Sequence, residues 1–107
     1  MREKVVETAL VSAVRELGGL PIKLVSPSMA GLPDRLILLP GARASFIELK
    51  APGRKMRPLQ VRRASQITAL GFPVVCIDHP DQIRPVLEQL RVWQTGDPIP
   101  VGVRWQI

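Results

Sequence analysis

The chain has 107 residues, a length that fits one domain with a modest single core. Hydrophobic residues make up 46% and charged residues 22% of the sequence, so disorder is not the default state. With two Trp, two Phe and no Tyr, the aromatic content is low, which argues against an RNA-binding or single-strand platform that stacks bases on aromatic side chains. We find no apolar run long enough for a membrane span and no signal-peptide layout, so we expect a cytoplasmic protein.

Residues 2–18 are predicted to form a helix that ends at Gly18. Its apolar residues recur at helical spacing and form one stripe, made of Val5, Val6, Ala9, Leu10, Ala13, Val14 and Leu17. Glu3 and Glu7 lie one turn apart on the flank of this stripe. On the simplest interpretation they are acids near the helix N-terminus that favour the helix dipole.

The next segments predict three strands, at residues 22–25, 36–39 and 46–49, the last two joined by a turn at Pro40-Gly41. Asp34 and Glu48 each lie seven residues from Gly41. In an antiparallel hairpin centred on Gly41 they would lie opposite one another, with Cβ atoms roughly 5 Å apart. Two facing carboxylates repel, so the arrangement favours a bound cation, and hard divalent metals prefer oxygen ligands.

Strand alternation places Lys50 on the same face as Glu48, whereas Ile47 and Leu49 point into a core. Two acids and a lysine above an apolar underside suit metal-assisted hydrolysis of phosphodiester bonds. Arg35, beside Asp34, should point away from this face, where it contacts either phosphate or an acid elsewhere in the chain. These two alternatives remain open.

The rest of the chain predicts a helix at 58–70, a strand buried on both sides at 73–77, and a third helix from about Arg84 to Leu90. Leu59, Ile67 and Leu70, with the small Ala64 and Ala69, supply the apolar positions of the second helix. Cys76 is predicted to be a buried small hydrophobe in a reducing compartment. His79, the single histidine, lies in a turn, far in sequence from any nucleophile motif.

The element order is helix, three strands, helix, strand, helix. This order predicts a small α/β domain with a mixed sheet, whose last strand is reached through a crossover helix. Residues 1–91 form the domain. Residues 92–107 form a C-terminal extension that acts as an added strand, an arm or a dimer contact.

The net charge of +6 is concentrated in one segment. Six cations lie within fourteen residues and no acid occurs from residue 51 to residue 77; the cations are Lys50, Arg54, Lys55, Arg57, Arg62 and Arg63. Such a run is suited to a phosphate backbone, although a solvated surface run is the simpler alternative. Its position directly after Glu48 and Lys50 favours nucleic acid.

The same residues carry a resemblance. Pro33-Asp34 followed by Glu48-x-Lys50 resembles the PD-(D/E)xK signature of restriction-endonuclease-like nucleases. The longer sequence around these residues resembles the VRR-NUC domain, especially its stand-alone phage-type members. It consists of Gly-Leu-Pro-Asp-Arg, then Phe-x-Glu-Leu-Lys-Ala-Pro-Gly, with Gln60 beyond it. The resemblance covers about residues 3–90.

The resemblance implies a restriction-endonuclease-like fold and a DNA endonuclease that depends on Mg²⁺ or Mn²⁺, in a bacterial or phage-infected cell. It implies that a glutamate of the first helix joins Asp34, Glu48 and the backbone carbonyl of Leu49 as metal ligands. Glu7 fits that glutamate best, and Glu3 is the alternative. Lys50 and Gln60 would complete the catalytic set.

The resemblance further implies a resolvase of four-way DNA junctions that acts as a homodimer, so that two sites cut symmetric strands. Arg35, Arg54, Lys55, Arg57, Arg62 and Arg63 would contact the DNA. One alternative is a nickase or flap endonuclease that needs a partner such as a helicase or another replication or repair protein. Another alternative is a basic DNA-binding module without catalysis.

Overall fold

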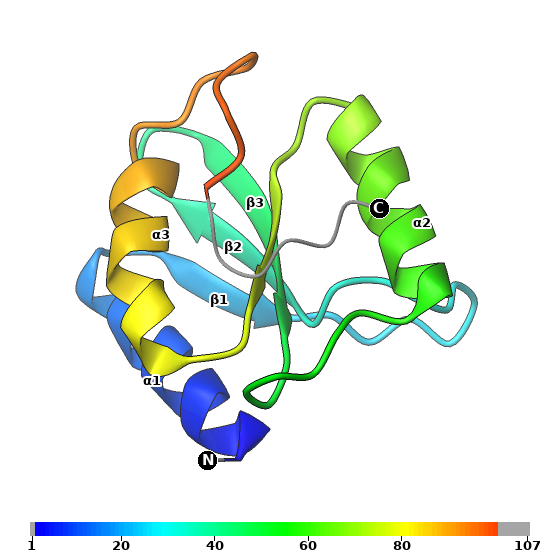
Figure 1. Cartoon of the computed structure of the whole chain (residues 1–107). Helices are drawn as coiled ribbons and strands as arrows, with labels where there is room; N and C mark the ends of the chain where they lie inside the picture. The colour runs from blue at the N-terminus through cyan, green and yellow to red at the C-terminus, as the bar shows by residue number, and fades with distance from the viewer. Residues whose placement is uncertain (1, 101–107) are drawn as a thin grey trace.

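The computed structural model describes residues 2–100, which form three α-helices and one four-stranded sheet (Figure 1). The elements follow the predicted order: α1 (Glu3–Glu16), β1 (Leu20–Lys23), β2 (Arg35–Leu39), β3 (Arg43–Leu49), α2 (Pro58–Ala69), β4 (Val74–Ile77) and α3 (Ile83–Leu90). A short 3₁₀ helix, Pro80–Gln82, precedes α3. The α/β fold with a mixed sheet is therefore confirmed.

The strands lie in the order β1-β2-β3-β4. β1, β2 and β3 are antiparallel neighbours, whereas β4 runs parallel to β3 and is reached through α2. Figure 1 shows α1 and α3 on one side of the sheet and α2 on the other. The carboxyl ends of β3 and β4 thus meet at one edge of the sheet, which the start of β2 also reaches.

The main core lies between the sheet and the α1–α3 pair. α1 buries Val6, Leu10 and Val14, each four residues from the next, because residues at this spacing lie on one helix face. β3 buries Ile47 and Leu49 toward the same core, as strand alternation predicts. Val5, which was predicted to belong to the apolar stripe, is 49% exposed because it lies at the edge of that face.

Two local predictions were wrong. β1 begins two residues earlier than expected and ends at Lys23, because its partner β2 begins at Arg35, which pairs with Lys23. In α2 only Ala64 is buried, while Leu59 and Leu70 are exposed, because α2 covers the sheet mainly over β4. Cys76 is fully buried, as predicted, and burial raises the pKa of its thiol to about 12.

The chain after α3 forms turns, without a strand, up to residue 100, and Ile99 packs against the core. The added-strand alternative therefore fails for residues 92–100, and the remainder of that prediction lies outside the described residues. His79 accepts a hydrogen bond from the N–H of Asp81 and so caps the 3₁₀ helix. Among residues 2–100, no helix has the length and apolar character of a membrane span.

Candidate active site

The site is built at the edge of the sheet where β2 begins and β3 ends. The register pairs Arg35 with Ile47, so Asp34 and Glu48, one step further out, face each other as predicted. The Asp34 N–H donates to Glu48 Oε1 (3.2 Å), and the Leu49 N–H donates to Asp34 Oδ2 (2.8 Å). Each carboxylate is therefore held by the backbone of the strand that carries the other.

Glu48 is only 1% exposed, an unusual position for an acid. Burial, followed by the neighbouring Asp34 carboxyl, raises the pKa of Glu48 to about 7, and Lys50 opposes this increase. A buried carboxyl beside a second one is stable either with a proton or with a cation between the two. The pair thus has the chemistry of a hard-cation site, with oxygen ligands on two adjacent strands.

Lys50 and Gln60 both reach Glu48 Oε2. The Lys50 Nζ lies 3.3 Å from this oxygen, and Gln60 Nε2 donates to it at 2.6 Å. Gln60 also accepts a hydrogen bond from the Arg57 N–H (2.8 Å), which fixes the orientation of its amide at the first turn of α2. The predicted direction of both side chains is confirmed, since they meet Glu48 from the end of β3 and from α2.

The Leu49 carbonyl lies on the side of Asp34. In a strand, the N–H and C=O groups of one residue point to the same side, and the Leu49 N–H points to the Asp34 carboxylate. Two carboxylates and one carbonyl therefore lie at the same end of the sheet, and oxygen donors of these kinds are the ligands that Mg²⁺ and Mn²⁺ prefer. The role of Leu49 as a ligand stays a prediction.

Glu7 is engaged elsewhere. Its Oε2 accepts from Arg35 Nη2 at 3.0 Å, and Arg35 Nη1 donates to the Pro21 carbonyl. Of the two alternatives for Arg35, the structure shows the pairing with an acid. Within residues 2–100, no group of three or more His, Cys, Asp or Glu side chains could hold one metal ion together. Glu7 and the exposed Glu3 are therefore not brought to Asp34 and Glu48, and their role as a third ligand stays a prediction.

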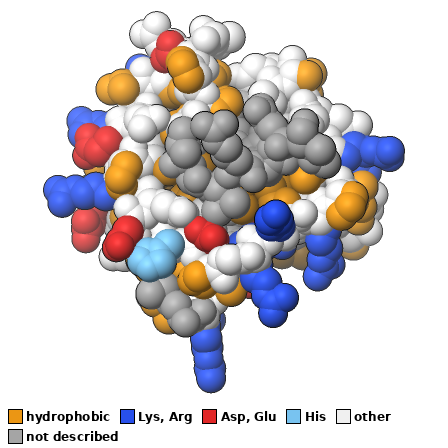
Figure 2. Space-filling view, viewed as in Figure 1, with side chains coloured by type: hydrophobic (Ala, Val, Ile, Leu, Met, Phe, Trp, Pro, Cys, Tyr) orange, Lys and Arg blue, Asp and Glu red, His pale blue; other side chains and the backbone are white. Residues whose placement is uncertain are grey.

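Apart from Arg35, which is on β2, the predicted DNA-contacting cations lie on α2 and on the loop before it. Arg54, Lys55, Arg57 and Arg62 are exposed. Figure 2 shows blue side chains along the right and at the lower right, and Figure 1 places α2 on the right side of the molecule. Arg63 differs, because its guanidinium donates to the Ala30 carbonyl (3.0 Å) and to Gln66 Oε1. It thereby fastens the loop before Asp34 to α2.

Sequence analysis missed one residue that supports the site. Asp78 follows β4 as Lys50 follows β3, and its carboxylate accepts from the Gly53 N–H (3.0 Å) and from Gln82 Nε2 (2.8 Å). These bonds hold the turn that follows Lys50. The signal was present, because a polar residue directly after a buried parallel strand lies at the same sheet edge as its neighbours.

Comparisons with known proteins agree with this geometry. No family model matches the sequence. The chain is 46% identical over 81 residues to a protein named "Putative nuclease p44" of Acyrthosiphon pisum secondary endosymbiont phage 1, a match that covers 76% of this chain and 87% of that protein. A solved structure described as a VRR_NUC domain superposes with a TM-score of 0.76 at 29% identity, covering 80% of this chain and 94% of the other.

Proposed function

The chain belongs to the VRR-NUC family of nucleases, and we propose that it hydrolyses phosphodiester bonds of DNA with a divalent metal ion held by Asp34, Glu48 and the Leu49 carbonyl. One observation carries this proposal: the two carboxylates face each other with Glu48 almost fully buried. A surface acid pair would separate into water, whereas these side chains are held together by the strands themselves.

The metal, Mg²⁺ or Mn²⁺, would lower the pKa of a bound water and offset charge on the scissile phosphate. Asp34 and Glu48 are positioned before substrate arrives, because backbone N–H groups hold one oxygen of each. For Glu7 to act as a further ligand, its carboxylate must first leave Arg35. Arg35 would then lose its acid partner and keep the bond to the Pro21 carbonyl.

Lys50 and Gln60 act at the second oxygen of Glu48. The Lys50 side chain is only 14% exposed, so its ammonium is held at the site rather than in solvent. It would orient or help deprotonate the attacking water, or neutralise charge in the transition state. Gln60 would help to position water or substrate, because its amide cannot rotate without losing the bond from Arg57.

The preferred substrate is a four-way DNA junction, cut by a homodimer. An apolar sheet face supports the dimer: α2 covers β4, and on β1 Leu20 is 60% and Ile22 39% exposed. Leu36 and Leu38 pair with these residues in β2 and continue the same face. A second copy placed here would bury apolar side chains and give two active sites for symmetric strands.

Dimer formation is tested by analytical ultracentrifugation of the Ile22→Lys variant. We expect wild type to sediment as a dimer and the variant as a monomer, because one lysine per subunit would be buried in a symmetric interface. Val5→Lys is the matched control, since Val5 is also exposed but lies on α1. A wild-type monomer, or a monomeric control, would remove the proposed interface.

Cleavage is tested with an end-labelled four-way junction and a matched linear duplex in Mg²⁺, Mn²⁺ or EDTA. We expect paired cuts in the junction alone, lost in EDTA and reduced about 10²–10³-fold in Lys50→Ala, the loss typical when a transition-state donor is removed. Lys4→Ala, an exposed lysine of α1, is the control.

Cuts in nicked or flapped DNA would favour the partner-dependent nickase or flap endonuclease. Binding without cleavage in every metal would favour a DNA-binding module. Each of these outcomes would remove the junction assignment.

A further inference from the structure

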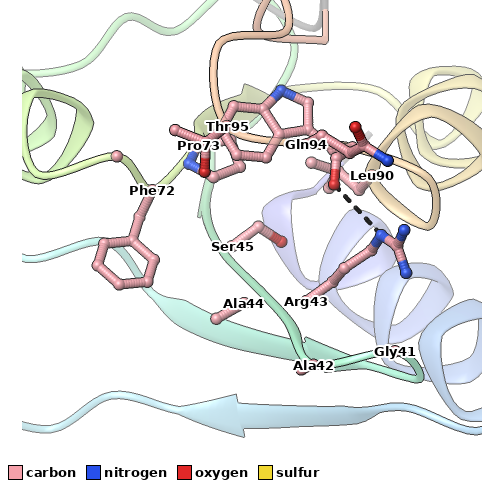
Figure 3. Close-up of a pocket in the computed structure, with 12 residues that line it drawn as sticks. Gly41, Ala42, Arg43, Ala44, Ser45, Phe72, Pro73, Leu90, Gln94 and Thr95 are labelled. Atoms are coloured by element: carbon pink, nitrogen blue, oxygen red, sulfur yellow. Dashed lines mark hydrogen bonds between the residues drawn. The ribbon is translucent and has the colours of Figure 1, made fainter.

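A second concave site lies at the other end of β3, away from the carboxylates. An open cavity of about 360 Å³ is lined by the turn before β3 and the start of β3, by residues 71–73 before β4, and by Leu90 and residues 93–95 (Figure 3). This volume is within the range of small-molecule sites. Because β3 is seven residues long, the two ends of the strand are about 20 Å apart.

The floor of this cavity contains a polar atom without a partner. Ser45 is only 3% exposed, and its hydroxyl has no hydrogen bond within the described residues. Its neighbours on the core face of β2 and β3 are Ile37 and Ile47, so an apolar residue would be expected here. In Figure 3 the hydroxyl points toward the space between Leu90 and Arg43. A buried hydroxyl without a protein partner would gain a hydrogen bond from an ordered water or from a ligand in the cavity.

The wall of the cavity is cationic. Arg43 Nε donates to the Trp93 carbonyl (3.2 Å), which holds the guanidinium over Gly41, where a Cβ would collide with Nη1. Among residues 2–100, the two terminal amino groups of Arg43 have no hydrogen-bond partner, and no carboxylate lines the cavity. The cavity therefore offers two charged donors to an anion.

Backbone groups at the start of β3 that have no partner in β4 also face the cavity. The Phe46 N–H donates to the Pro73 carbonyl, so the peptide groups of alternate β3 residues point toward β4. β4 begins only at Val74, the partner of Phe46, and Ala44 lies beyond its start. The N–H and C=O groups of Ala44 thus point past the end of β4, toward the cavity that Ala44 lines. A donor beside an acceptor matches the edge of a nucleobase.

We propose that this cavity is a nucleotide-binding site separate from the active site. The Arg43 guanidinium binds the phosphate, the Ala44 peptide edge and the Ser45 hydroxyl bind the polar edge of the base, and Trp93 supplies the apolar wall against which the base lies. The choice of a nucleotide over another planar anion rests on the proposed function. The nucleotide comes either from an unpaired position of the DNA substrate or from free monophosphate in solution.

Isothermal titration calorimetry of the full chain with deoxyadenosine monophosphate in EDTA tests binding without catalysis. We expect one saturable site, weakened about tenfold or more in Arg43→Gln, because a charge-assisted bond is lost, and about fivefold in Ser45→Ala. Arg84→Gln, an exposed arginine of α3 that does not line the cavity, makes the same charge change and should bind as wild type. The unfolding temperature of each variant shows that it is folded.

Titrations with inorganic phosphate alone and with deoxyadenosine alone test the phosphate-binding and base-binding parts of the site separately. Each should bind more weakly than the nucleotide. If phosphate alone binds as tightly as the nucleotide, the cavity is an anion site and the inference fails. It also fails if Arg84→Gln weakens binding as much as Arg43→Gln.

A duplex with one unpaired adenosine and a fully paired duplex, both in EDTA, distinguish the two sources. Tighter binding of the first duplex that is lost in Arg43→Gln and Ser45→Ala would identify the substrate as the source. Monophosphate binding with no such preference would identify the free nucleotide. If neither ligand responds to the two substitutions, the inference is overturned. Lys50→Ala tests the nuclease separately, since it leaves this cavity intact.

Discussion

The two ends of β3 hold polar groups in opposite ways. At the carboxyl end, both Glu48 oxygens have partners: the Asp34 N–H on one, and Gln60 with Lys50 on the other. At the amino end, the Ser45 hydroxyl is as deeply buried and has none. In the first arrangement the protein itself already satisfies the polar groups, as the proposed catalytic role requires. The second has an unmet hydrogen bond that a ligand would complete.

The largest expected effect is a loss of cleavage when the charge of Glu48, at the carboxyl end of β3, is removed. Glu48→Gln keeps the shape and the bonds to Oε1 but removes a negative metal ligand, so we expect cleavage to fall by about 10²–10³-fold or more. Calorimetric titration with Mn²⁺ should show binding in wild type and a loss of affinity in the variant. Glu16→Gln, an exposed acid of α1, should match wild type. Unchanged Mn²⁺ affinity in Glu48→Gln would remove Glu48 from the ligand set.

The second expected effect is a pH dependence of folding stability, and it originates from Glu48 at the same end of β3. In the folded protein the pKa of Glu48 is raised from 4.5 to about 7, so the folded state binds more protons than the unfolded state between these values. The stabilisation that protonation of Glu48 gives to the folded state is therefore complete below pH 4.5 and is lost as the pH rises through about 7, a change of about 3 kcal/mol.

Urea denaturation in EDTA, from pH 4.5 to 8, measures this change as the difference between wild type and Glu48→Gln. The stability of wild type relative to Glu48→Gln should fall as the pH rises. A difference that stays constant across the range would mean that Glu48 does not titrate there. Mg²⁺ should counteract the loss in wild type, since it stabilises the ionised carboxylates.

The local sequence pattern was sufficient to predict much of the fold and of the candidate site. The element order, the opposition of Asp34 and Glu48 and the side of Lys50 all follow from strand alternation and from one turn at Pro40-Gly41. The failures depended on contacts distant in sequence. The exposure of Leu70 reflects where α2 lies on the sheet. For Arg35, which was expected to contact phosphate or an acid, the structure shows the acid, Glu7, 28 residues away.

The cavity was also beyond sequence reasoning. Ser45 lies just before the expected strand at residues 46–49. The structure shows that β3 begins earlier, at Arg43, so that the Ser45 side chain lies on the core face beside Ile37 and Ile47. The aromatic content of the chain argued against base stacking, yet the fold brings Trp93 to the cavity. Composition gives the number of such residues but not where the fold gathers them.

The smallest expected effects are changes in stability when one side chain is truncated at each end of β3. Gln60→Ala removes the bond from the Arg57 N–H and one donor to Glu48, so we expect about 1–2 kcal/mol lower stability in urea denaturation of the ligand-free protein. Ser45→Ala removes a hydroxyl that has no bond to lose, so stability should stay the same or rise by up to about 1 kcal/mol.

The two ends differ in that only Gln60→Ala is expected to lower stability, and each measurement can contradict this. A Ser45→Ala variant that is destabilised like Gln60→Ala would show that the hydroxyl already has a structural partner in solution, such as an ordered water. Addition of deoxyadenosine monophosphate sharpens the test, because it should stabilise wild type more than Ser45→Ala and leave the effect of Gln60→Ala unchanged. Equal stabilisation of wild type and Ser45→Ala would place the nucleotide away from this hydroxyl.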